Sequence, residues 1–408
     1  METRIPVLDG KQVVLGVSGG IAAYKSADLT SRLVKAGAIV DVVMTAAATE
    51  FVRPITFQAL THRPVALEMF ALLQETEIGH VALGQRADLM VIAPATANTL
   101  AKLACGLADN LLVTTALACR APILLAPAME SGMWSNPATA ANMQILRDRG
   151  LHVIGPEPGR LASGGYGSGR MSEPADILEA CRWLLGRGGA IAGRKVVVTA
   201  GGTREALDPV RFVGNRSSGK MGFALAAAAR DRGAEVTLIH GPAAGRIPHG
   251  SRGVAVESAE EMKAAVLAAA ADADALLMAA AVADYRPAAP AVQKIKKDGE
   301  TLRVDLVRTA DILAETAAVR ARTGRPRVVV GFAAETQELI ANARAKLARK
   351  GLDLIAANDV TAVDAGFEVD TNRVTLLDAA GGVDALPLMT KPEVAERIID
   401  RVVRLLPA

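Results

Sequence analysis

The sequence predicts an α/β protein with two domains, each built on a doubly wound parallel sheet. The 408 residues exceed the usual length of one domain. Short β-branched runs alternate with longer amphipathic stretches, which is typical of a parallel sheet with helices on both faces. The glycine-rich stretch 186–194 interrupts this alternation and is the best linker candidate. We therefore expect one domain at residues 1–190 and a second at residues 191–408.

Five buried strands are expected in the first domain. Most of their residues are apolar and do not alternate with polar ones, as in strands that are covered on both faces. The expected strands lie at residues 12–17, 38–44, 88–93, 122–129 and 151–155. Helical spacing is clearest at residues 21–37, 136–150 and 174–185, and the first two of these segments end at glycine.

The segment 155–171 is rich in glycine, proline and serine, and it is too long for an ordinary connection. We interpret it as a loop that is either disordered or a functional flap.

The second domain restarts the alternation without repeating the first sequence. Its expected strands lie at residues 195–200, 234–239, 274–280, 327–332 and 353–358, and a helix is expected at residues 218–231. A second parallel sheet follows from this order.

The composition excludes several classes of protein. A formal net charge of +3 gives no basic surface for nucleic acid. Three cysteines are too few for a disulfide framework, and no Cys/His cluster indicates a transition metal. The N-terminus lacks an apolar signal core, and Asp272 and Asp274 interrupt the alanine-rich run 264–283. We expect a soluble, cytoplasmic protein without a membrane segment.

The turn GVSGGIAAYK (16–25) is the first candidate binding site. Gly16 and Gly19 permit close backbone approach, and the helix N-terminus that follows attracts phosphate. Ser18 suits a flavodoxin-like phosphate loop, while a tight turn without ligand is the alternative. The spacing differs from G-x-G-x-x-G, which disfavours a nicotinamide oxidoreductase.

Three further residues follow the ends of expected strands. Thr45, Thr96 and Asn98 lie where open α/β sheets bind ligands, although helix capping would also explain them. Because three such loops share one sheet edge, we expect a cofactor pocket there. His80 is an isolated histidine that either moves a proton or has a structural role.

The motifs SGGIAAYK, APATANT, PAM-x-x-x-MW and GSGRM, together with His80, resemble the flavin-dependent phosphopantothenoylcysteine decarboxylases over residues 11–185. The resemblance implies that FMN lies against these loops, at a contact between subunits of a trimer. It also implies that His80 is the base in oxidation of the substrate cysteine, and that Met133 and Trp134 belong to a motif closing over the substrate. The FMN would supply the electron chemistry.

Two positions depart from this family. Glu130 stands where the family usually has an asparagine that holds the substrate carboxylate. Ser163 takes the place of a cysteine that protonates the enethiolate in many members. An ionised Glu130 would repel that carboxylate, so we expect it to be protonated or turned away.

The segment GNRSSGKM (214–221) fits the P-loop pattern except at Met221, which cannot hold a magnesium ion. It does not directly follow an expected buried strand. We interpret it as a hydrogen-bonding loop before a helix.

The motifs TAGGTREALDP, GNRSSGKMG, AAAVADY, KIKK, GFAAET and AAND resemble phosphopantothenate–cysteine ligase over residues 194–400. The resemblance implies CTP with Mg²⁺, and an acyl-cytidylate engaged by Asn215. The implied substrate and CTP positions are Met278, Ala279, Ala280, Asp284, Lys294, Ala310, Asp311, Ile312, Leu313, Phe332, Lys346 and Lys350. A solvated charge run at KIKK, and an exposed helix face at Lys346 and Lys350, are the alternatives.

Together the resemblances identify a member of the bifunctional CoaBC family. They imply that the chain joins cysteine to 4′-phosphopantothenate with CTP and decarboxylates the product to 4′-phosphopantetheine in coenzyme A synthesis. Trimeric flavin domains and dimeric ligase domains would build a homo-oligomer, a dodecamer. The alternative is an active ligase fused to a flavin-binding domain that has only a structural or regulatory role.

Overall fold

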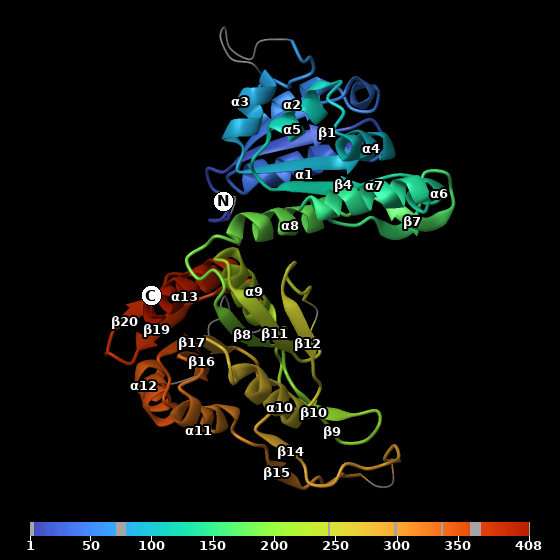
Figure 1. Ribbon diagram of the computed structural model, residues 1–408. Helices are drawn as coiled ribbons and strands as arrows, with labels where there is room; N and C mark the ends of the chain where they lie inside the picture. Colours follow the sequence, from blue (N-terminus) through green and yellow to red (C-terminus); the bar gives the residue numbers. More distant parts are fainter. Residues whose placement is uncertain are drawn as a thin grey trace. The chain divides into compact units, whose positions relative to one another are not determined.

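The computed structural model describes residues 4–70, 79–243, 245–297, 300–335, 338–359 and 369–407 (Figure 1). The chain divides into two compact units, Met1–Gly186 and Arg187–Ala408. Each unit has its own sheet and its own buried clusters.

The sheet of the first unit has five parallel strands in the order β2-β1-β3-β4-β5. The strands are β1 (Gln12–Val17), β2 (Ile39–Met44), β3 (Leu89–Ala95), β4 (Ile123–Pro127) and β5 (His152–Val153). This order is that of the flavodoxin-like doubly wound fold, so the predicted fold class is confirmed. The expected strand at 151–155 is only two residues long.

Helices cover both faces of this sheet (Figure 1). Val13 and Leu15 of β1 share one buried cluster with α1 and α8, while Val14 shares the other with α4, α5 and α7. The helices are α1 (Ala23–Lys35), α2 (Pro54–Thr61), α3 (Gly79–Arg86), α4 (Ala97–Cys105), α5 (Leu111–Ala118), α6 (Ser131–Trp134), α7 (Pro137–Asp148) and α8 (Pro174–Gly186), with the 3-10 turn η1 (Ala46–Glu50). Burial on both faces explains why β1 is apolar after its first residue, Gln12.

The segment expected to be a loop over residues 155–171 is mostly an antiparallel hairpin of β6 (Glu157–Arg160) and β7 (Tyr166–Arg170). The backbone N–H of Leu161 donates to the carbonyl of Gly165 at 2.8 Å and closes its turn. The expectation was wrong because glycine and proline usually weaken strands, and here they occur within one.

Glycines allow the hairpin to dock closely on the loop after β4. A Cβ atom on Gly169 would lie 2.1 Å from the carbonyl oxygen of Met129, and one on Gly167 would lie 2.2 Å from the Oγ of Ser131. At this contact the N–H of Met129 donates to the carbonyl of Gly169 at 2.9 Å. The hairpin base is therefore fixed to the loop that carries Glu130.

The second unit contains an eight-stranded sheet in the order β12-β11-β8-β13-β16-β17-β19-β20. Its strands are β8 (Lys195–Ala200), β11 (Glu235–His240), β12 (Arg252–Ala255), β13 (Ala275–Met278), β16 (Val328–Glu335), β17 (Leu354–Asp359), β19 (Val374–Asp378) and β20 (Val383–Ala385). The first six are parallel and follow the 3-2-1-4-5-6 order of the Rossmann-like fold. The last two are antiparallel and were not expected from the sequence.

Helices also cover both faces of the second sheet, with α9 and α13 on one face and α10 to α12 on the other. These helices are α9 (Lys220–Asp231), α10 (Ala259–Ala270), α11 (Ile312–Thr323), α12 (Leu339–Lys350) and α13 (Lys391–Leu405). Three small antiparallel ribbons complete the unit: β9 (Arg204–Ala206) with β10 (Phe212–Gly214), β14 (Tyr285–Pro287) with β15 (Leu306–Arg308), and β18 (Thr371–Asn372) with β21 (Met389–Thr390).

The expected linker over residues 186–194 is only partly a linker. Gly186 ends α8, while Ile191 is buried in the core of the second unit and its N–H donates to the carbonyl of Arg232 at 3.0 Å. Most of this stretch therefore packs as part of the second unit.

Candidate active sites

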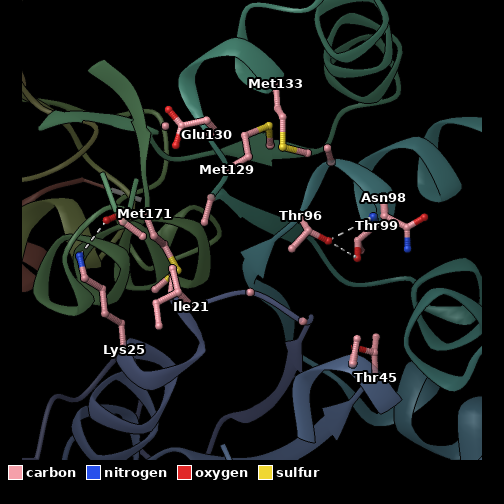
Figure 2. A pocket seen from close by; sticks show the side chains of 18 of the residues that line it. Ile21, Lys25, Thr45, Thr96, Asn98, Thr99, Met129, Glu130, Met133 and Met171 are labelled. Atoms are coloured by element: carbon pink, nitrogen blue, oxygen red, sulfur yellow. Dashed lines mark hydrogen bonds between the residues drawn. The ribbon is translucent and has the colours of Figure 1, made fainter. Parts of the chain in front are cut away.

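A cavity of about 1050 Å³ lies at the carboxyl edge of the first sheet. Its walls come from the loops after β1 to β4 and from the β6–β7 hairpin. Figure 2 shows Thr45, Thr96 and Met129 around this cavity. The three strand-end loops that the sequence singled out thus contribute to one site.

Four of the six residues expected to bind the cofactor line the cavity: Gly19, Thr45, Thr96 and Asn98. Ser18 lies behind the wall, where its Oγ donates to the carbonyl of Pro94 at 2.7 Å and accepts from the N–H of Thr96 at 3.1 Å. Gly16 is buried in β1 against Leu112. Both residues therefore support the wall from within the fold.

Two features of the wall suit a planar polar cofactor with a phosphate. The Oγ1 atom of Thr45 is buried and has no hydrogen-bonding partner in the part of the chain that the structure describes. A Cβ on Gly19 would lie 2.4 Å from the Cβ of Ala47, so the backbone here is closely packed beside the N-terminus of α1. Thr45 offers a hydroxyl that a ligand can satisfy, and α1 offers N–H groups to an anion.

Ion pairs neutralise most charges around the cavity. The buried Nζ of Lys25 donates to the carbonyl of Met171 and to Glu173, each at 3.0 Å, and Arg170 also contacts Glu173. The hydrogen bond from Lys25 is the main cause that lowers the pKa of Glu173. Lys102 pairs with Asp109 at 2.6 Å, and this bond lowers the pKa of the Asp109 carboxyl.

His80 does not line this cavity. It is the second residue of α3, and its Nδ1 is buried without a partner among the described residues. A single chain therefore does not bring the expected base to the expected flavin loops.

Of the two positions that depart from the decarboxylase motif, Glu130 lines the cavity and Ser163 does not. Glu130 lines the cavity as the N-cap of α6, is exposed, and its carboxylate points away from Thr45 and Thr96 in Figure 2. Ser163 is exposed in the hairpin turn, where its Oγ accepts from the N–H of Gly165 at 3.4 Å.

Asn215 lies in a smaller cavity of the second unit, about 280 Å³ in volume, with Arg204 and Ser217 among its neighbours. Its Nδ2 donates to the carbonyls of Val282 at 3.1 Å and Ala281 at 3.4 Å. The residue expected to engage the acyl-cytidylate is therefore bonded to the loop that was expected to contact CTP. The GNRSSGKM segment follows β10 of a small ribbon, and not a strand of the central sheet.

Two buried threonines fix the backbone of that loop. The Oγ1 of Thr199, at the end of β8, accepts from the N–H of Ala280 at 3.0 Å. The Oγ1 of Thr203 accepts from the N–H of Ala283 at 2.9 Å. These residues were not singled out from the sequence, although both lie in or beside the TAGGT motif.

Most of the expected CTP residues lie together around β13, β16 and the start of α11. Met278 and Ile312 share a buried cluster, and Ala280 and Leu313 pack against it. Lys350 pairs with Asp311, the N-cap of α11, and Lys346 donates to the carbonyl of Phe332 at 2.8 Å. Ala279 and Ala310 adjoin these residues in sequence, and Asp284 accepts through its carbonyl from the N–H of Thr309 at 3.0 Å.

Lys294 lies apart from this group in the described contacts. It is exposed on the segment after β14, next to Ile295, whose N–H donates to Asp208 at 3.1 Å. Arg211 also donates to the carbonyl of Ile295. Lys294 is thereby held beside the turn that joins β9 and β10.

Within the ranges given above, no helix is long and apolar enough to cross a bilayer. The same residues contain no group of three or more His, Cys, Asp or Glu side chains arranged to hold a metal ion.

Comparisons with known proteins match each half of the chain to a family model. Residues 6–185 match the family model described as Flavoprotein, and residues 191–406 match the DNA/pantothenate metabolism flavoprotein C-terminal domain. The crystal structure of the C-terminal domain of a coenzyme A biosynthesis bifunctional protein CoaBC is 39% identical, covers 53% of this chain and 97% of its own, and has a TM-score of 0.45.

Two curated relatives, both coenzyme A biosynthesis bifunctional proteins CoaBC, align over nearly their whole length. The protein of Vibrio cholerae serotype O1 is 47% identical over 96% of this chain and 98% of its own. The protein of Mycobacterium bovis is 48% identical over 99% of this chain and 98% of its own. The chain therefore belongs to the family of coenzyme A biosynthesis bifunctional proteins CoaBC.

Proposed function

We propose that the chain catalyses two consecutive reactions of coenzyme A biosynthesis. In the first, residues 191–408 join cysteine to 4′-phosphopantothenate with CTP; in the second, residues 1–190 decarboxylate the product to 4′-phosphopantetheine. The observation that carries the proposal is the presence in one chain of a flavodoxin-like cavity and a Rossmann-like edge that gathers most of the expected CTP residues. The near-full-length relatives support the same pairing.

The first site fits FMN. The hydroxyl of Thr45 and the polar side chains of Thr96 and Asn98 would hold the cofactor, and the backbone after β1 would receive its phosphate. When bound, FMN supplies the two-electron oxidation and reduction that the decarboxylation needs. The chain itself closes the site with the hairpin, and Met133 lies in its wall.

His80 would accept a proton from the substrate cysteine as general base. Because it does not line the cavity of its own chain, we propose that it serves the cavity of another copy. This arrangement agrees with a homo-oligomer built from trimeric flavin domains and dimeric ligase domains, as in a dodecamer. Light scattering of the purified protein tests the assembly.

In the second site, Asn215 would hydrogen-bond the acyl-cytidylate, and the loop after β13 would contact the nucleotide. Lys294, Lys346 and Lys350 would face the triphosphate, which Mg²⁺ would accompany. Exchange of Lys294 for glutamine should lower ligase turnover, since the triphosphate would lose one cationic partner. We place both reactions in the cytoplasm, where cysteine and CTP are available.

The test is mass analysis of products from 4′-phosphopantothenate, CTP and cysteine. The complete mixture should give 4′-phosphopantetheine, CMP and carbon dioxide, and omission of CTP should abolish all three. Accumulation of 4′-phosphopantothenoylcysteine would instead support the alternative of an active ligase with an impaired flavin domain. His80→Asn is the matched variant: it should accumulate that intermediate while the flavin absorbance is retained.

A further inference from the structure

The charged residues that line the cavity of the first unit are not all neutralised. Its cations are Lys25, Lys102, Arg160 and Arg170, and its anions are Asp109, Glu130 and Glu173. Lys102 forms an ion pair with Asp109, and Glu173 forms ion pairs with both Lys25 and Arg170. Within the described part of the chain, Arg160 is the cavity cation that has neither an ion pair nor a side-chain hydrogen bond.

The fold holds Arg160 at the rim of the cavity. It is the last residue of β6, is exposed, and lies opposite Tyr166 of β7. The hairpin base is fixed by the bond between Met129 and Gly169, and its turn is closed by the bond between Leu161 and Gly165. The guanidinium group therefore projects from a supported element, which favours a role in binding.

We propose that Arg160 binds the 4′-phosphate of the decarboxylase substrate and so makes this site selective for phosphorylated substrates. The inference rests on the proposed function of the first unit. The substrate is a linear molecule with its cysteine at one end and its phosphate at the other. If the cysteine lies beside Met129 and Met133 of the PAM-x-x-x-MW loop, the phosphate at the other end of the molecule can lie toward the rim that carries Arg160. An arginine fork matches the oxygens of a phosphate dianion and binds it with charge-assisted hydrogen bonds.

Two other anions are less suitable partners for Arg160. We expect the phosphate of FMN at the N–H groups after β1, where close glycine packing leads into α1. The substrate carboxylate belongs to the reacting end of the molecule, beside the PAM-x-x-x-MW loop. The test below distinguishes both alternatives. If Arg160 bound the FMN phosphate, its exchange would lower the flavin content of the protein. If it bound the substrate carboxylate, its exchange would weaken substrates with and without the 4′-phosphate equally.

The experiment uses the full-length, FMN-loaded chain and two substrates, 4′-phosphopantothenoylcysteine and pantothenoylcysteine. The variants are Arg160→Gln, Arg160→Lys and the control Arg147→Gln, which removes an exposed arginine from the last turn of α7 outside the cavity. Arg160→Gln should raise KM for the phosphorylated substrate about tenfold with kcat unchanged, as expected for one charge-assisted hydrogen bond at an exposed site. Arg160→Lys should be intermediate, and Arg147→Gln should equal the wild type.

A binding measurement gives a second readout without chemistry. Titration of the loaded protein with 4′-phosphopantetheine and with pantetheine should show that Arg160→Gln weakens binding of the phosphorylated compound alone. Equal losses for both compounds, no loss for either, or a lower flavin content would each overturn the assignment. If the wild type decarboxylates neither substrate, both the proposed function and the assignment of Arg160 are wrong. If the wild type is active and Arg160→Gln has an unchanged KM for the phosphorylated substrate, only the assignment of Arg160 is wrong.

Discussion

Exchange of Gly169 for alanine should detach the β6–β7 hairpin from the loop that carries Glu130. The added Cβ would lie 2.1 Å from the carbonyl oxygen of Met129, whereas ordinary contact begins near 3.4 Å. The two backbones must therefore separate by more than 1 Å, since the obstacle is a carbonyl and not a flexible side chain. The hydrogen bond from Met129 to Gly169, 2.9 Å long, cannot survive that separation.

The cost follows from that bond. Loss of a buried backbone hydrogen bond with an unsatisfied partner costs about 1–3 kcal/mol. The equilibrium constant for opening of the hairpin should then rise roughly 5- to 150-fold. Because the hairpin supplies one wall of the cavity, decarboxylation should fall while ligation in the second unit is unchanged.

The assay is hydrogen exchange of the Met129 amide in the full chain, together with the rate of protease cutting within residues 157–171. Both should increase in Gly169→Ala. Gly165→Ala is the matched control, since its Cβ would meet only the Oγ of Ser163, at 3.6 Å. Unchanged exchange and cutting in a folded Gly169→Ala protein would show that the hairpin is not held by this contact.

Three further predictions concern single side chains. Glu130→Gln should retain or raise decarboxylase activity, because it removes a negative charge from the wall of the cavity; loss of carbon dioxide release with FMN still bound would contradict this. Asn215→Asp should stop ligation or accumulate acyl-cytidylate, because a charge would face the acyl phosphate; normal turnover in the coupled assay would count against that role. The lowered pKa of Glu173 means that its ion pair with Lys25 stabilises the fold above the unfolded pKa, near 4.5, and that this contribution is lost as pH falls through the folded pKa. The effect on the free energy of unfolding should stay below about 1 kcal/mol because Glu173 is partly exposed, and Lys25→Met should flatten this pH dependence in denaturation curves.

The parallel sheets could be predicted because their strands are buried on both faces. Val13 and Leu15 pack in one buried cluster and Val14 in the other, on the opposite face of the sheet. Because both faces are buried, these successive residues are all apolar, which is the pattern of a buried parallel strand. The hairpin at residues 157–170 could not be predicted, because a local sequence rich in glycine is typical of a loop. Here Gly167 and Gly169 instead allow close packing against the loop after β4. At the antiparallel end of the second sheet, β20 was missed because it is short and exposed, whereas β19 was missed although most of its residues are buried.

Part of the first site could also be predicted. Thr45 and Thr96 could be predicted because each directly follows an expected parallel strand, and the carboxyl ends of parallel strands lie at one edge of the sheet. The pairing of Lys25 with Glu173 depends on contacts between distant segments, which no local pattern reveals. His80 was expected at the site from its motif alone, and the structure places it on α3, where it does not line the cavity of its own chain.

The hydroxyls of Thr199 and Thr203 have a thermodynamic consequence for the second unit. They hold the N–H groups of Ala280 and Ala283 before any ligand arrives. A nucleotide that docks on this loop would meet a backbone that is already ordered, so less conformational entropy would be lost on binding. In calorimetry, Thr199→Val should shift the balance toward a more unfavourable binding entropy, with a weaker overall affinity and little change in the sheet beneath.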